Sequence, residues 1–179
     1  MPNEDAKGDI CMPGMTPRKV VLALLYAPGK TGAMEPISGI TRFEKMLFLL
    51  TSNKFRDVFN DLDYAADNFG PYSGTLVDLL ENLSDLDLIE KEKGKIIDVA
   101  DEANSYDGRT IPDVYRLTDY GSALAESIFN SLSGEERREI TQMKSDLNSM
   151  SLDALLGYVY NTVDAKWLEN SHIREAYTY

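Results

Sequence analysis

The stretch that decides the fold lies at positions 69–91 and reads FGPYSGTLVDLLENLSDLDLIEK. Glycine and proline at its start indicate a turn that leads directly into a helix, with Pro71 in the first helical turn. Leucines then repeat at helical spacing, with acidic and amide side chains on the other side. The pattern predicts a turn, an amphipathic helix after Tyr72, and a strand over positions 88–91.

Two helices are expected before this stretch. Thr16 and Pro17 are typical of a cap and a first helical residue, and the helix they open should end near Tyr26, followed by a loop to Gly39. Thr41 is predicted to cap the second helix, in which one apolar stripe faces the core and the charged side chains lie away from it. The stripe is Phe43, Met46, Leu47 and Leu50, and the charged side chains are Arg42, Glu44 and Lys45.

A returning strand at positions 114–117 and three further helices are expected after it. Thr118, Ser133 and Ser151 each stand where a helix cap is needed, and Ser133 with Glu136 forms a capping box. The fold class is therefore mainly α with a small β-hairpin, a winged helix-turn-helix-like core plus C-terminal helices. The expected organisation is a flexible N-terminal arm (1–15), a winged-helix-like domain (16–132) and a C-terminal helical extension (133–179).

The composition is that of an acidic globular protein. The 179 residues are 43% apolar and 27% charged, with a formal net charge of −12. The single cysteine, Cys11, excludes an intramolecular disulfide and favours a cytoplasmic setting. The longest apolar run, positions 20–27, is far shorter than the roughly 20 residues that cross a bilayer, so no membrane association is expected.

The sequence offers few parts for catalysis or for a cofactor. Gly29-Lys30-Thr31 resembles part of a phosphate-binding loop, but position 24 is Leu24 where that motif needs glycine, so a plain turn is favoured. One histidine, His172, and one cysteine far away in the chain are too few for a zinc site or a cysteine–histidine pair. No enzyme activity, catalytic residue, metal ligand or cofactor is predicted.

Charge also bears on nucleic-acid binding. Positions 57–90 contain nine acidic residues and no lysine or arginine, although a winged helix that reads DNA presents its second helix-turn-helix helix to the major groove. The nucleic-acid candidates therefore lie in the wing, at Lys91, Lys93, Lys95 and Arg109. A solvated strand edge, protected by lysines, is the simpler interpretation of these cations.

Several segments together resemble the SocA-like (Panacea) antitoxin domains and related phage-associated winged-helix proteins. They are positions 43–50 (FEKMLFLL), the FGPYS turn at 69–73, the leucine-rich helix after it, and positions 115–121, which read YRLTDYG. The resemblance covers roughly residues 18–132 and implies an antitoxin-like or adaptor module without enzymatic activity. The partner-binding candidates are Phe69, Gly70, Pro71, Tyr72 and Ser73, unless this turn only sets the angle of the helix.

Two functions therefore stay open at the level of sequence. The favoured one is a non-enzymatic protein-binding module, antitoxin-like or regulatory, whose partner is another protein and, given the acidity of this chain, a basic one. The alternative is a DNA-binding transcriptional regulator that uses a basic wing, with nucleic acid disfavoured as a partner. A homodimer is compatible with both.

Overall fold

The structure is a computed structural model that describes residues 14–94 and 111–177. It confirms the expected fold class, mainly α with a small β-hairpin. The helices are α1 (Pro17–Tyr26), α2 (Ile40–Asn53), α3 (Arg56–Asp61), α4 (Gly74–Asp85), α5 (Asp119–Ser131), α6 (Gly134–Asn148), α7 (Leu152–Thr162) and α8 (Arg174–Tyr177), with a 3-10 turn η1 (Ala165–Leu168). The strands are β1 (Ile37–Ser38), β2 (Ala65–Asp67), β3 (Gly70–Tyr72), β4 (Ile89–Glu92) and β5 (Val114–Leu117).

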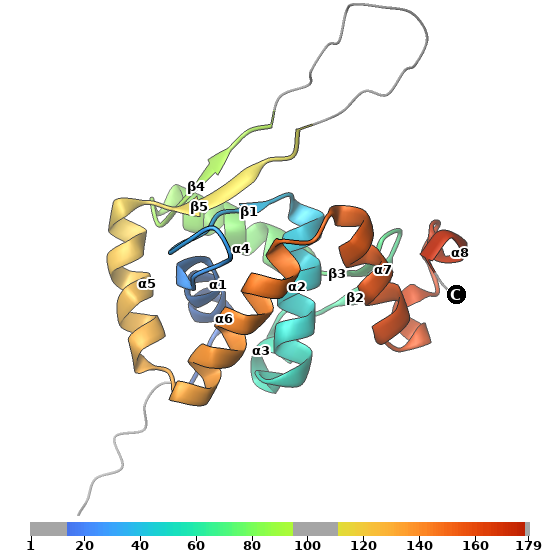
Figure 1. The fold of residues 1–179 in the computed structure, drawn as a ribbon, viewed down its shortest axis with the longest axis horizontal. Helices are drawn as coiled ribbons and strands as arrows, with labels where there is room; N and C mark the ends of the chain where they lie inside the picture. The colour runs from blue at the N-terminus through green and yellow to red at the C-terminus, as the bar shows by residue number, and fades with distance from the viewer. Residues whose placement is uncertain (1–13, 95–110, 178–179) are drawn as a thin grey trace, which may run out of the picture.

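Helix α2 is the centre of the molecule. It lies between α6 and α7 (Figure 1) and also packs on α3, β1 and β3. Because neighbours surround the helix, Glu44 and Lys45 are buried together with the apolar stripe, and the expectation that they lie away from the core is wrong. The helix also begins at Ile40 after Gly39 and has no side-chain cap, so the cap predicted at Thr41 is wrong as well.

A three-stranded antiparallel sheet joins the segment after α1 to the hairpin β4–β5. β5 lies in the middle, paired with β1 through Ile37 and Tyr115 and with β4 through Ile89 and Leu117. The strand at 114–117 has the predicted bounds, and the one predicted at 88–91 is shifted by one residue. β1 was expected to be loop, and it is a strand because the segment after α1 returns to the free edge of β5.

Helix starts follow the expected capping residues. The hydroxyls of Thr16, Thr118, Ser133 and Ser151 each accept a backbone hydrogen bond from the first turn of α1, α5, α6 and α7. The capping box of α6 is also present. Thr118 serves the connection from β5 as well, because its hydroxyl donates to the carbonyl of Asp87. These four predictions are confirmed. Such caps can be recognised from sequence because each capping contact joins residues three positions apart.

The C-terminal helices are tied to the core by two cations. Lys144 of α6 is fully buried, and its ammonium donates to the carbonyls of Leu25 (2.8 Å) and Ala27 (2.7 Å) at the end of α1. Arg42 of α2 donates to the carbonyl of Leu147 (3.0 Å) at the end of α6. Both cations thus lie at helix C-termini, where the backbone dipole favours positive charge. Residues 1–13 of the expected arm and 95–110 of the wing lie outside the described residues.

The loop between α1 and β1 folds around an internal carboxylate. Glu35 accepts hydrogen bonds from the backbone amide of Thr31 (2.7 Å), from its hydroxyl, and from the side-chain amide of Asn148. Glu35 therefore occupies both donors of Thr31, and the amide of Gly29 is bonded to the carbonyl of Gly32. A Cβ on Gly29 would lie 2.4 Å from the carboxyl carbon of Glu35. The segment is a closed turn.

Candidate functional site

The FGPYS segment forms a β-hairpin before its helix begins. Pro71 lies in β3 and pairs with Ala66 of β2, so its predicted place in the first helical turn is wrong. The helix starts later because the hydroxyl of Ser73 caps it, accepting from the amide of Leu76 at 3.0 Å. Gly70 has φ +86°, in the left-handed region that favours glycine, which agrees with the role expected of it in the turn.

Two buried charged residues of α2 form hydrogen bonds to the backbone of this hairpin. Lys45 is 1% exposed, and its ammonium donates to the carbonyl of Pro71 at 2.6 Å. The neighbouring Glu44 accepts a long hydrogen bond, 3.5 Å, from the amide of Ser73. The FEKMLFLL and FGPYS segments, which the sequence shows as separate motifs, are therefore one structural unit.

The environment shifts both charges towards their neutral forms. Burial raises the pKa of Glu44 to about 7, against the opposing attraction of Lys45. Burial likewise lowers the pKa of Lys45 to about 8, although the carboxylates of Glu44 and Asp67 favour its charged form. Each group thus stabilises the charged form of the other, and the Lys45 contact with Pro71 lies inside this pair.

The C-terminal segment holds the other side of the hairpin. The amide of His172 donates to the carbonyl of Asn68 (3.2 Å), and the side chain of Asn170 donates to the carbonyl of Ala66 (3.0 Å). The backbone of Gly70 faces Leu168 and Tyr160. His172 thus contributes through its backbone, and the segment after α7 has a structural role that sequence patterns did not indicate.

Only two of the five predicted partner-binding side chains reach the surface. Phe69 at the hairpin tip is 51% exposed and Tyr72 is 38% exposed, whereas Gly70, Pro71 and Ser73 are buried. Tyr72 lies against Gly74, the first residue of α4. The hairpin therefore presents two aromatic rings beside the start of that helix, and the other three residues build the support.

Helix α4, which begins two residues after Tyr72, exposes carboxylates along its length. It buries Leu76, Leu80 and Leu83, and its exposed residues include Asp78, Glu81 and Asp85. The sequence has no lysine or arginine between positions 57 and 90. The surface formed by Phe69, Tyr72 and the acidic face of α4 is called the aromatic–acidic surface below.

The cations of the β4–β5 hairpin are partly neutralised. Lys91 forms a salt bridge with Asp113 (3.6 Å), and Arg116 forms one with Glu92 (2.8 Å). Lys93 is exposed, and the other two nucleic-acid candidates, Lys95 and Arg109, lie outside the described residues. Lys91 therefore lies in β4 and Lys93 directly follows it, and among the described residues of this hairpin Lys91 and Arg116 are paired with acids.

Comparisons with known proteins add no further assignment. Neither the protein-family models nor the curated proteins give a match to the chain. Within residues 14–94 and 111–177, no cluster of histidine, cysteine or acidic side chains is placed to hold a metal ion. In the same ranges, no helix has the length and apolarity to cross a membrane.

Proposed function

We propose that this chain is a non-enzymatic protein-binding module, antitoxin-like or a regulatory adaptor, on a winged-helix scaffold. The order of elements supports the scaffold: α1, β1 and α2 precede α4, and the hairpin β4–β5 follows, in a sheet of order β1-β5-β4. In this interpretation α4 is the helix that a DNA-binding relative would place in the major groove.

One observation carries the proposal. At the position where a DNA reader needs cations, α4 exposes Asp78, Glu81 and Asp85, and two exposed aromatic rings stand at its start. Carboxylates repel phosphate, whereas they attract lysine and arginine on a protein surface. Exposed aromatic rings are common anchors of protein interfaces. The aromatic–acidic surface therefore suits a basic protein partner.

Site-specific photocrosslinking in the source cells tests this proposal. A photoreactive phenylalanine analogue replaces Tyr72, and a control chain carries the same analogue at Tyr120, which is 68% exposed on α5. We expect the Tyr72 chain to form a discrete covalent adduct with a basic protein and the Tyr120 chain to form none. The same adducts from both positions, or none from Tyr72, would count against the proposal.

The DNA-binding alternative is tested on the purified chain. Fluorescence anisotropy with labelled genomic fragments at about 50 mM salt detects binding that depends on phosphate contacts. We expect no change in anisotropy. Binding that weakens steeply with salt and is lost on Lys91→Gln and Lys93→Gln substitution would support the alternative and overturn the protein-binding proposal.

A further inference from the structure

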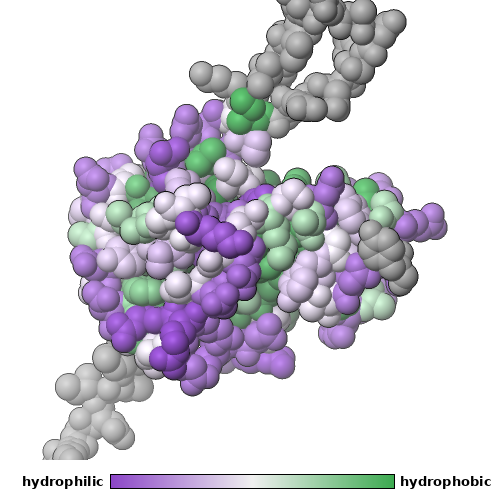
Figure 2. Space-filling view, viewed as in Figure 1, coloured by the Kyte–Doolittle hydropathy of each residue, from purple (hydrophilic) through white to green (hydrophobic). Residues whose placement is uncertain are grey.

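A groove runs along α2 between α6 and α7, which form its walls. It has a volume of about 740 Å³, and its apolar lining includes Leu49, Met143, Leu147, Met150 and Tyr158. Figure 2 shows this lining as an apolar strip between α6 and α7. It is called the α2 groove below.

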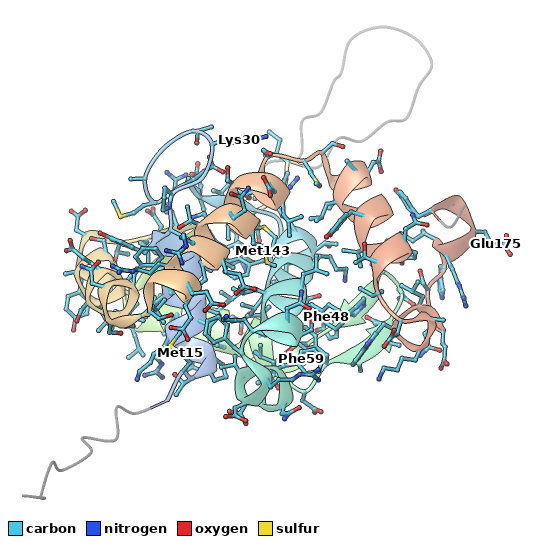
Figure 3. The ribbon with its side chains drawn as sticks, turned by 60° about the horizontal axis from the view of Figure 1, so that its bottom comes forward. Met15, Lys30, Phe48, Phe59, Met143 and Glu175 are labelled. Carbon is cyan, nitrogen blue, oxygen red and sulfur yellow. The ribbon has the colours of Figure 1, made fainter. Side chains whose placement is uncertain are left out.

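A second hollow extends the α2 groove towards η1. It measures about 280 Å³, shares Leu49 with the first, and is lined by Phe48, Phe59 and Trp167. Phe48 and Phe59 lie close together (Figure 3), with ring centroids 5.5 Å apart, and the Phe48 and Trp167 centroids are 5.1 Å apart. The packed rings give this end a fixed shape, whereas the methionines at the other end can adapt to different side chains.

The charges around the α2 groove differ between its walls. Glu139 and Asp146 line it from α6, and Lys30 lines it from the loop after α1. Glu139 is paired with Lys54 at 3.4 Å, while Asp146 is exposed and accepts a hydrogen bond from Gln142 (2.9 Å). The α6 wall therefore offers a carboxylate to a cation on an incoming partner.

The second hollow has a different balance. Arg56, Lys166 and Asp164 line it, and the Lys166 ammonium lies 5.2 Å from the Trp167 ring centroid. The second hollow thus has two cations and one carboxylate, whereas the first has two carboxylates and one lysine, so an incoming cation is favoured at the end where Asp146 lies. A partner segment in the α2 groove needs apolar side chains along its length and lysine or arginine beside them at that end.

We propose that the α2 groove binds an amphipathic helix of a partner protein, with basic side chains next to its apolar stripe. The 11 residues of α7 make a wall of about 16 Å, which matches three turns of an incoming helix. Apolar side chains at spacings of three and four residues enter between Met143 and Tyr158, and a lysine or arginine faces Asp146. This inference rests on the proposed function and adds the element by which the partner binds.

Methyl NMR on the full chain tests the inference. The protein is labelled at its methionine methyl groups and titrated with a synthetic 15-residue peptide of leucine and lysine in helical periodicity. We expect the Met143 and Met150 signals to move, because both line the α2 groove. The signals of Met46, which is fully buried, and Met34, on the loop after α1, serve as internal controls and stay in place.

Charge and shape are separated by two matched variants. Asp146→Lys is expected to weaken binding of the leucine–lysine peptide about tenfold and to strengthen binding of a leucine–glutamate peptide of the same pattern. Tyr158→Ala removes an exposed ring from the wall and should also weaken binding about tenfold, whereas Tyr120→Ala on α5 should not. Both tyrosines are exposed, so neither variant challenges folding.

Three results would overturn the inference. They are equal methyl shifts at Met34, Met46, Met143 and Met150, equal binding of both peptides, and groove shifts that follow protein concentration without peptide, which would identify a second copy as the occupant. The outcome is separable from that of the proposed function. If a photoreactive residue at position 158 forms no adduct while the one at position 72 does, the α2 groove is not the binding site. The proposed protein-binding function would still stand.

Discussion

Replacing Lys45 by methionine removes the ammonium that holds the FGPYS hairpin on α2. The side chain is 1% exposed and donates to Pro71 at 2.6 Å, so the change leaves a buried carbonyl without this donor, at a cost of about 1–3 kcal/mol. Glu44 also loses the attraction of the Lys45 charge, and leaving a buried charge uncompensated costs roughly 3–5 kcal/mol. Because the pKa of Glu44 is already raised to about 7, protonation relieves part of that cost. We expect a loss of about 3 kcal/mol.

Urea unfolding at pH 7 measures this loss, with the fluorescence of Trp167 as the reporter. The ring packs against Phe48 of α2, so its emission follows the packing next to the hairpin. With a denaturant dependence of about 2 kcal/mol per molar urea, the midpoint should fall by about 1.5 M. Lys54→Met is the matched control, because Lys54 caps the same helix but pairs with Glu135 at the surface, and its midpoint should stay close to that of the unaltered chain.

The double variant Glu44→Gln/Lys45→Met isolates the coupling between the two charges. If the pair is coupled as the structure indicates, the double variant is more stable than the sum of the single changes implies. A Lys45→Met midpoint as close to the unaltered chain as that of the surface control would refute the account of the hairpin. Strict additivity of the two changes would refute the charge pair alone.

Three further changes have definite expected outcomes. Ser73→Ala removes the cap that Leu76 uses and should lower the free energy of unfolding by about 1–2 kcal/mol in urea titration. Gly121→Ala would bring a Cβ within 1.7 Å of the Leu88 carbonyl oxygen, so the melting temperature should fall by several degrees in calorimetry, and an unchanged value would contradict the close approach. Lys144 keeps its proton in the unfolded chain up to about its ordinary pKa of 10.5, but burial lowers this pKa to about 7 in the fold. Unfolding therefore takes up a proton between these values, and stability rises with pH across that window. Lys144→Met should show a smaller rise in urea titrations at pH 7 and 9.

Local signals were sufficient for much of the fold. Helix caps depend on contacts three or four residues apart, so Thr118 and Ser133 could be recognised from sequence alone. The strand at 114–117 stood out because it is apolar and returns after a polar excursion. The two-residue strand β1 has no such periodicity, since its position depends on a pairing between Ile37 and Tyr115 that is far apart in the chain.

The buried cations were the main feature that sequence patterns did not reveal. Lysine is rarely buried without a partner, and the partners of Lys45 and Lys144 are backbone carbonyls, which no pattern marks. A weaker signal was nevertheless present. Phe48 and Leu49 carry the apolar surface of α2 round to the side of Lys45, and Lys144 lies between Ile140 and Leu147 on the apolar stripe of α6. A helix that is apolar on all sides predicts full burial.

The proposed resemblance to antitoxin-like winged-helix proteins depends on segments whose residues mostly form contacts inside this fold. Lys45 binds Pro71, Ser73 caps α4, and Gly121 allows close packing on the backbone of Leu88. Residues of this kind specify the scaffold, and a scaffold by itself does not define a partner. Specificity must then come from side chains that the scaffold leaves exposed. On this chain we propose that those are the rings and carboxylates of the aromatic–acidic surface and the lining of the α2 groove. Exchanging these surface residues should then change the partner without changing the fold.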